Sequence, residues 1–596
     1  MTIASLFKDP ARTRMFLWAL GITVGVWLVV WVLCRLLFRA SKAPARGFLL
    51  LLVTITGATV LALEVLGTRV IGTEYGSSLF VWAALITVTL VCLAFGYAVG
   101  GRLADRVPKP WMLYLLVMLA GGSVLLVPLM TDVLGPMTDL FGLTWGALAS
   151  AMVLFFLPLT LLATAGPYVI RLRARSVEGM GSTSGAVYAL STIGSVAGAL
   201  AVSLYMIPHL GTRTSLLICA GVLIGMGAFG LALLSRGWAG VLVLLASGAL
   251  FIPDRTPTLE GELYRTESAF GQLRVLQRDV EGRGLYRMLM VNGIMQTGMP
   301  LDIDLVGPAD ILQTDSYHLE LLPYFYPDLG AGRRGVLIGL AGGMFPRVME
   351  FYDVDWTAVE IDVKVAELAK AYFGYRGEIR DAGGKLREVD LSRFPDRASP
   401  VMADHLAQAG EEHADEHAPP GEYRGRAVIQ DGRRFLADLP APVDFVVLDA
   451  YNSDAIPFHL ITREFFELVR GRLTDDGILA INYIGVPRGD FVTDSLLRTL
   501  GAVFGRDKLR AYRTRAEADE AQVIIIFAMR DRRELLPLWR DDTGGGADPL
   551  SYELTQRRVE TDRPAGAIIT DDHNPIDLAR ATTALQWRRQ AMAAFR

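Results

Sequence analysis

The sequence predicts a chain of two fold classes, an N-terminal α-helical transmembrane bundle and a C-terminal α/β domain with a small β-unit before it. Three observations lead to this prediction. Apolar runs of helix length follow one another up to about Pro253, strand-like segments and a strand–glycine loop–helix pattern follow, and acidic residues stand at the ends of successive strands. We expect domain boundaries at 1–253, 254–330 and 331–596.

Composition narrows the classes of function. The chain has 596 residues, of which 52% are hydrophobic, enough for two or more domains with full cores. Its 58 Lys and Arg against 62 Asp and Glu give a net charge of -4, so we expect no nucleic acid partner. The three cysteines, Cys34, Cys92 and Cys219, all lie in apolar runs, which favours packing roles over disulfides or a metal cluster.

The apolar runs predict about seven or eight membrane spans, since one span needs roughly 20 apolar residues. The first run is too long for a secretory signal and no small-residue cleavage site follows it, so we expect it to be retained. The candidate spans are Met15–Phe38, Gly47–Ile71, Leu79–Gly100, Trp111–Met130, Thr144–Ile170, Gly185–Ile207, Ser215–Leu234 and Trp238–Ile252.

Polar and small residues inside the spans have two interpretations each. Glu64 and Arg69 share one apolar run, where charge is costly unless it faces the protein interior. They indicate either a substrate or lipid site, or an ion pair or an Arg that reaches the membrane interface. The pairs Gly96/Gly100 and Gly194/Gly198 have the spacing that lets helices approach closely, and packing is sufficient to explain them.

The second half begins with a predicted small antiparallel unit. Gln272–Gln277 and Arg287–Val291 are β-like and are separated by glycine-containing turns. From Gly335 the pattern changes to a buried strand, Val336–Ile338, followed by the loop Gly339-Leu340-Ala341-Gly342-Gly343 and the helix-compatible Met344–Tyr352.

A second strand, Trp356–Val359, completes a nucleotide-binding βαβ pattern. It ends in Glu360-Ile361-Asp362 and leads into the helical Val363–Tyr372. Glycines let the backbone approach a ligand, and an acid about 20 positions later can hold both ribose hydroxyls. The same pattern also occurs in unrelated parallel sheets.

Two further strands end in acids. Arg426–Gln430 leads into Asp431-Gly432, and Val443–Leu448 leads into Asp449. Ligands of open parallel sheets bind beyond the carboxyl ends of the strands, so Glu360, Asp431 and Asp449 are expected to converge on one crevice. A single such acid is explained by helix capping, but three at successive strand ends are not.

These segments resemble the spermidine synthases, or polyamine aminopropyltransferases, and more closely their membrane-fused bacterial relatives. The matching segments, in chain order, are Glu267–Gln272, Val291–Gln296, Tyr317–Glu320, the glycine loop, Glu360–Asp362, Asp431-Gly432, Asp449–Phe466 and Thr570–Pro575. The resemblance implies a Rossmann-like, methyltransferase-type fold. It also implies transfer of an aminopropyl group from decarboxylated S-adenosylmethionine to a polyamine such as putrescine, releasing methylthioadenosine.

The resemblance also implies roles for individual residues. Asp449 would be the general base that takes a proton from the amine. Tyr317 would act with it in catalysis, and Glu360 would hold the ribose. The amine would be bound by His318, Glu320, Gln296, Tyr451 and Asp454, and the donor by Gly339, Ala341, Gly342, Gly343, Ile361, Asp431, Gly432, Gln272 and Pro457. No metal is expected, and a homodimer is compatible with the family.

The sequence departs from the family at three places. The family has an Asp that holds the donor amine where this chain has Gly342, and a nucleotide-contacting Gln where it has Gly271. The second Asp of the catalytic loop is matched by neither Asn452 nor Asp454 unambiguously. The donor is therefore either decarboxylated or ordinary S-adenosylmethionine. The rival functions are a methyl- or alkyltransferase, and a polyamine transporter or sensor with a non-catalytic domain.

An acidic insertion of about 376–425 falls within the 68 residues between Asp362 and Asp431. It contains His405, His413 and His417 among acids, which predicts either a metal site or a mobile acidic loop that covers a cationic substrate. His459 and His573 have structural interpretations, although His573 stands among acids that could border the active site.

Basic loops predict the orientation in the membrane. They contain Arg35–Arg46, Arg102–Lys109 and Arg171–Arg175 and alternate with loops nearly free of positive charge. Eight full crossings would place both termini outside, whereas an enzyme that uses a cytosolic nucleotide should face the cytoplasm. Either the short last segment does not cross fully or the count differs. We expect a multi-pass protein of the inner membrane, in contact with lipid, with its catalytic domain on the cytoplasmic side.

Overall fold

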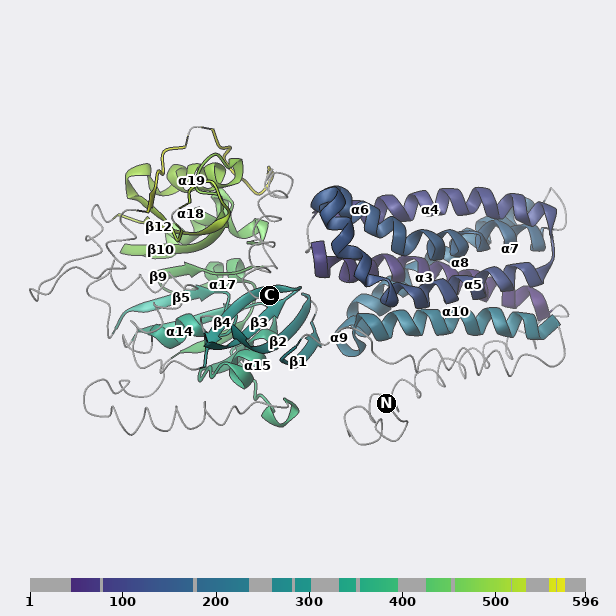
Figure 1. The fold of residues 1–596 in the computed structure, drawn as a ribbon, viewed down its shortest axis with the longest axis horizontal. Helices are drawn as coiled ribbons and strands as arrows, with labels where there is room; N and C mark the ends of the chain where they lie inside the picture. Colours follow the sequence, from purple (N-terminus) through teal and green to yellow (C-terminus); the bar gives the residue numbers. More distant parts are fainter. Residues whose placement is uncertain are drawn as a thin grey trace, which may run out of the picture. The chain divides into compact units, whose positions relative to one another are not determined.

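The structure is a computed structural model, and its chain divides into two compact units. The residues that it describes are 44–75, 79–174, 179–234, 260–268, 270–280, 284–301, 332–349, 354–394, 425–451, 456–515, 517–531, 557–563 and 565–573. One unit is helical and the other contains both sheets (Figure 1).

The helical unit confirms six of the predicted spans. Among its described residues, six stretches are long and apolar enough to cross a membrane: Gly47–Tyr75, Val81–Arg106, Pro110–Leu129, Trp145–Arg173, Met180–Leu210 and Thr212–Leu231. They are built from α3 (Pro44–Tyr75), α4 (Leu79–Arg106), α5 (Pro110–Leu126), α6 (Leu134–Ala163), α7 (Ala165–Arg173), α8 (Met180–Ala201), α9 (Ile207–Leu210) and α10 (Thr212–Leu234). The predicted spans Met15–Phe38 and Trp238–Ile252 lie outside the described residues.

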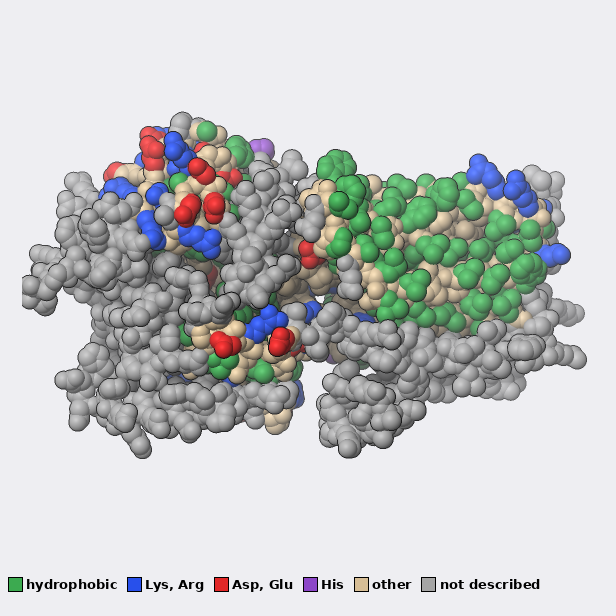
Figure 2. All heavy atoms as spheres, viewed as in Figure 1, with side chains coloured by type: hydrophobic (Ala, Val, Ile, Leu, Met, Phe, Trp, Pro, Cys, Tyr) green, Lys and Arg blue, Asp and Glu red, His purple; other side chains and the backbone are tan. Residues whose placement is uncertain are grey.

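Glycines allow these helices to touch backbone to backbone, as their spacing predicted. A Cβ on Gly194 or Gly198 of α8 would collide with the carbonyl oxygen of Thr54 or Ala58 of α3. The Ser195 hydroxyl donates to Gly57 O of α3 at 2.9 Å. The visible face of the unit is covered by hydrophobic side chains, as a lipid-facing surface requires (Figure 2).

The small β-unit is confirmed as a four-stranded antiparallel sheet in the order β1-β2-β3-β4. Its strands are β1 (Glu262–Glu267), β2 (Gln272–Val280), β3 (Gly284–Val291) and β4 (Ile294–Pro300). Arg287 of β3 is only 1% exposed and donates to Tyr372 O and to Gln277 Oε1. This buried side chain joins the small sheet to the larger domain through Tyr372.

The larger sheet has nine strands in the order β13-β11-β12-β10-β9-β5-β6-β8-β7. In chain order they are β5 (Arg334–Ile338), β6 (Asp355–Glu360), β7 (Glu378–Asp381), β8 (Arg426–Ile429), β9 (Val443–Leu448), β10 (Leu473–Gly485), β11 (Leu509–Arg513), β12 (Gln522–Met529) and β13 (Arg558–Val559). The pairings from β7 to β10 are parallel and those of β12, β11 and β13 are antiparallel. The order confirms the predicted α/β class and places β5 between β9 and β6.

Both faces of the sheet are buried. Phe445 and Val447 of β9 pack in one hydrophobic cluster, whereas the alternating Val446 and Leu448 pack in another. The helices that follow strands are α14 (Met344–Met349), α15 (Val363–Tyr372), α17 (Gly432–Asp438), α18 (Arg463–Arg472) and α19 (Phe491–Phe504). Continuous apolar strands such as Val443–Leu448 are typical of this two-sided burial.

Candidate active site

The parallel strands bring four of the predicted positions to one edge. Ile338 of β5 pairs with Val359 of β6 and with Leu448 of β9. The residues after these three, Gly339, Glu360 and Asp449, therefore stand side by side at the carboxyl ends. Glu360 pairs in turn with Ile429 of β8, two residues before Asp431. This edge is where open α/β sheets bind ligands.

The glycine loop has the backbone conformation that its sequence predicts. Gly339, Ala341 and Gly343 all have positive φ, at 95°, 47° and 74°. A Cβ on Gly339 would collide with Asp449 O, so only glycine fits between the two strand ends. The loop thereby keeps its backbone N–H groups close to the strand-end acids.

Glu360 is buried and its carboxylate organises this loop. Its oxygens accept hydrogen bonds from Leu340 N at 3.0 Å and from Asp362 N at 2.9 Å. Burial raises the pKa of Glu360 to about 7, while the backbone N–H donors act to lower it. A carboxylate that is this costly to ionise is stabilised further by any ligand that brings hydroxyl donors.

Asp449 is partly buried and is held by a residue that sequence reasoning did not identify. Asn482 lies opposite it on the neighbouring β10, where Leu448 pairs with Ile481. The Asn482 amide donates to Asp449 Oδ1 at 2.8 Å. Burial raises the pKa of Asp449 to about 7, although this hydrogen bond acts in the opposite direction. Asp449 can therefore exchange a proton near neutral pH.

Tyr451 lies beside Asp449, but its hydroxyl is already engaged. It donates to Asn482 O at 2.6 Å and accepts from Ile484 N at 3.0 Å. These bonds fix the segment after Asp449 against β10. In this arrangement both hydrogen bonds of the Tyr451 hydroxyl go to the backbone of β10.

Asp431 also has protein partners. It caps α17 by accepting from Arg434 N at 2.9 Å, and its other oxygen lies 2.9 Å from His459 Nε2. The neighbouring Arg433 binds Asp571 through two bonds of 2.8 and 2.6 Å, which hold the pKa of that carboxyl below its ordinary value. The Thr570–His573 segment and His459 thus lie beside the start of α17.

Gly342 packs against the small β-unit. Its N–H donates to the Thr297 hydroxyl of β4 at 2.8 Å, and Thr297 is 1% exposed. A Cβ on Gly342 would lie only 2.6 Å from Thr297 Cγ2. The spermidine synthases, which this sequence resembles, have an Asp at this position. In this chain Thr297 fills the space beside Gly342.

The remaining predicted residues are distributed unevenly. Gln272 accepts from Arg274 Nε at 2.8 Å, so its side chain is engaged within β2. Gln296 lies on β4 next to Thr297, and Pro457 is partly buried before Phe458. Ile361 is 46% exposed and Gly432 is buried against Ile338. Tyr317, His318, Glu320, Asp454 and the histidines of the insertion, His405, His413 and His417, lie outside the described residues.

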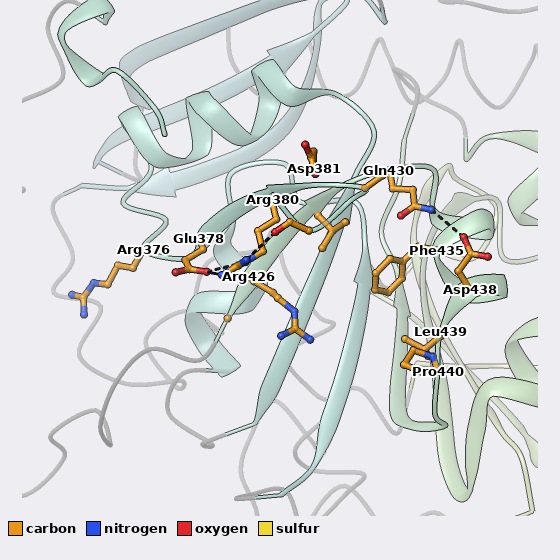
Figure 3. A pocket seen from close by; sticks show the side chains of 14 residues that line it. Arg376, Glu378, Arg380, Asp381, Arg426, Gln430, Phe435, Asp438, Leu439 and Pro440 are labelled. Atoms are coloured by element: carbon orange, nitrogen blue, oxygen red, sulfur yellow. Dashed lines mark hydrogen bonds and ion pairs between the residues drawn. The ribbon is translucent and has the colours of Figure 1, made fainter. Parts of the chain in front are cut away.

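A pocket of about 790 Å³ lies elsewhere, at the β7–β8 edge (Figure 3). Its lining includes Arg380 of β7, Arg426 at the start of β8, and Leu439 after α17. Arg380 pairs with Glu378 at 2.6 Å. None of the predicted site residues lines this pocket, so we place the candidate site at the strand ends instead.

Two contributors, Asn482 and Thr297, were missed for the same reason. Each reaches the site from a strand distant in the sequence, and neither belongs to a glycine loop or strand-end acid pattern. The one available signal for Asn482 was a polar side chain in the otherwise apolar run Ile478–Ile484.

Comparison with known proteins gives distant relatives. No protein-family model matches the chain. An N-terminal histidine N-methyltransferase of Emericella nidulans is 29% identical over 178 residues, 30% of this chain and 24% of that protein. A probable polyamine aminopropyl transferase of Bifidobacterium longum is 24% identical over 325 residues, 50% of this chain and 61% of that protein. A polyamine aminopropyltransferase of Vibrio vulnificus is 23% identical over 254 residues, 41% and 70% respectively.

These matches make the C-terminal half a distant homologue of the polyamine aminopropyltransferases, although the chain spans only 24% and 61% of the first two relatives. Among solved structures, spermidine synthase from Thermotoga maritima is 17% identical, with a TM-score of 0.32 over 50% of this chain and 84% of that one. Human methyltransferase-like protein 13 in complex with SAH is 20% identical, with a TM-score of 0.25 over 40% and 86%. The fold class rests on the strand order above.

Proposed function

We propose that this protein is a membrane-anchored aminopropyltransferase that uses decarboxylated S-adenosylmethionine and a small aliphatic amine such as putrescine. The observation that carries the proposal is Asp449, held by Asn482 beside the glycine loop and Glu360. Its pKa of about 7 suits a general base at neutral pH. The two relatives named as aminopropyltransferases support the same reaction.

The reaction needs such a base because an aliphatic amine carries a proton at pH 7 and is then no nucleophile. Asp449 accepts one proton as the amine nitrogen forms a bond to the propyl carbon. The bond from that carbon to the sulfonium sulfur breaks, and methylthioadenosine leaves. The donor supplies the activated carbon. The chain binds and orients the two substrates and removes the proton.

The residues around Asp449 fit the nucleoside part of the donor. Glu360 would hold the ribose hydroxyls, and the glycine loop would approach the nucleoside with its backbone. Asp431 and Gly432 would border the adenine, with the exposed Ile361 against the ring. Negative strand ends also suit two cationic substrates. Tyr317, His318, Glu320 and Asp454 remain the proposed amine contacts.

A second candidate is methyl transfer from ordinary S-adenosylmethionine. Two observations favour it: Thr297 fills the space beside Gly342, where the family's donor-amine Asp would stand, and one relative is named as a methyltransferase. The membrane side and membrane type are also proposals: the inner membrane, with the catalytic unit in the cytoplasm.

The test incubates the purified full chain with each donor and a panel of amines, and identifies the nucleoside product by mass spectrometry. Methylthioadenosine that depends on the amine supports the proposal, and an Asp449→Asn variant is the matched control. S-adenosylhomocysteine as the sole nucleoside product would replace the proposal with methyl transfer. Neither product, with intact nucleotide binding, would indicate a sensor.

A further inference from the structure

A polar cluster lies where α3, α4 and α6 of the helical unit meet, with Thr89 and Cys92 buried and Glu64 partly buried. Glu64 of α3 faces the Thr89 hydroxyl of α4. One turn further along α4, the Cys92 thiol faces the Thr160 hydroxyl of α6. The reaction proposed at Asp449 uses none of these groups.

Close helix packing surrounds the cluster. A Cβ on Gly67, one turn after Glu64, would lie 2.8 Å from Leu85 of α4 and 3.3 Å from Phe155 of α6. A Cβ on Gly96, one turn after Cys92, would lie 2.5 Å from Thr160 O. Three helices are therefore in contact at this level.

The cluster is also far from both ends of its spans. Glu64 is 17 and 11 residues from the ends of Gly47–Tyr75, and Cys92 is 11 and 14 residues from those of Val81–Arg106. Eleven helical residues rise about 16 Å, half of a hydrocarbon core of about 30 Å. The groups therefore stand near the middle of the membrane.

Unused hydrogen-bonding capacity accompanies the carboxyl. Thr89 is 3% exposed and Thr160 is 8% exposed. Neither hydroxyl oxygen completes a hydrogen bond with any described residue. The Thr89 hydroxyl lies against Glu64, and the Thr160 hydroxyl lies against the Cys92 thiol. Arg69, five residues along α3, is turned by about 140° from Glu64 around the helix.

We propose that Glu64, Thr89, Cys92 and Thr160 form an intramembrane site for one small, hydrogen-bond-donating cation, either a proton or the ammonium end of an aliphatic amine. A carboxylate at this depth is costly unless a positive partner accompanies it. The buried hydroxyl oxygens supply acceptors that such a partner satisfies.

The two occupants replace one another with charge conserved. An ammonium ion that enters binds the Glu64 carboxylate, the O–H bond of the neutral carboxyl breaks, and one proton leaves to water. The net charge of the site is zero before and after this exchange. The site therefore couples amine binding to proton release, independently of any chemistry at Asp449.

The test uses the full chain in lipid nanodiscs, with Asp449→Asn in every sample to silence the proposed base. Putrescine is added in weakly buffered solution and released protons are counted with a pH indicator. We expect about one proton per chain in the parent and in the matched control Glu74→Gln, which changes a carboxyl near the end of α3, and none in Glu64→Gln. Thr89→Val, which keeps the carboxyl, should need roughly ten-fold more putrescine.

A second arm titrates the same samples with base and no amine. A proton equivalent that is lost in Glu64→Gln but is unaffected by putrescine assigns the site to the proton alone. Titrations and amine responses that are identical in the parent, Glu64→Gln and Thr89→Val would overturn the proposal.

Discussion

Replacing Asn482 with the similarly shaped leucine should move the pH dependence of the reaction. The Asn482 amide donates to Asp449 Oδ1 and thereby lowers the pKa of a carboxyl that burial has raised to about 7. A hydrogen bond to a charged group contributes about 1.5–3 kcal/mol. Because 1.36 kcal/mol equals one pKa unit, its loss should raise the pKa of Asp449 by about 1–2 units.

The base works only when ionised, so the acid limb of kcat/KM should move from about pH 7 to about pH 8–9 in Asn482→Leu. At pH 7 the ionised fraction falls from about one half to one tenth or less, which lowers activity about five-fold or more. Activity should return at alkaline pH. The amine substrate titrates identically in assays of every variant. A difference between the pH profiles of two variants therefore reports a change in the enzyme.

The assay measures kcat/KM by methylthioadenosine release across pH, with Tyr451→Phe as the control. That variant loses the hydroxyl bonds to Asn482 O and Ile484 N but leaves the Asn482 amide on Asp449. It should lower stability by about 1–3 kcal/mol and leave the limb in place. An acid limb in Asn482→Leu at the wild-type pH would refute the reasoning.

Three further predictions concern the strand ends and the glycine loop. Asp449→Asn should abolish turnover and leave nucleotide binding mostly intact, which calorimetry with the nucleoside product measures; full activity would remove Asp449 as the base. Burial raises the pKa of Glu360 in the folded protein to about 7. The free energy of unfolding therefore falls as pH rises toward and through this value. Thermal denaturation should show less loss of stability between pH 5 and 8 in Glu360→Gln than in wild type, and equal slopes would contradict the assignment. Gly342→Asp should destabilise the chain by about 1–3 kcal/mol through collision with Thr297, and Thr297→Ala should recover part of this in a urea titration; an unchanged midpoint would show that the two do not compete for space.

Local patterns in the sequence were sufficient to predict the strands and the strand-end acids of the site. A continuous apolar run predicts a strand buried on both faces, and β9 has the predicted bounds, Val443–Leu448. The carboxyl ends of parallel strands share one edge of a sheet, so the convergence of Glu360 and Asp449 follows from their positions at the ends of two such strands. The six described spans follow from apolar length in the same way.

The partners of those residues could not be predicted, because they depend on which distant strands become neighbours. Gly342 meets Thr297, 45 residues earlier, only after the small sheet packs on the glycine loop. Asn482 meets Asp449 because β10 pairs beside β9 in a fixed register. Asp571 reaches Arg433 across 138 residues. None of these contacts produces a repeating pattern in the sequence.

The charges at the strand ends limit the choice of donor. Asp431 is committed to His459 and to the N-terminus of α17, and Glu360 to the loop N–H groups, so Asp449 is the strand-end acid that we propose for the amine. One carboxylate cannot both take the acceptor's proton and neutralise the ammonium of a decarboxylated donor. If that donor is used, Glu320 or Asp454 must supply the second negative charge. Glu320→Gln or Asp454→Asn should then raise KM for the decarboxylated donor about ten-fold, with little effect on ordinary S-adenosylmethionine, whose own carboxylate balances its ammonium. Equal KM changes for both donors would exclude these acids as the counter-charge.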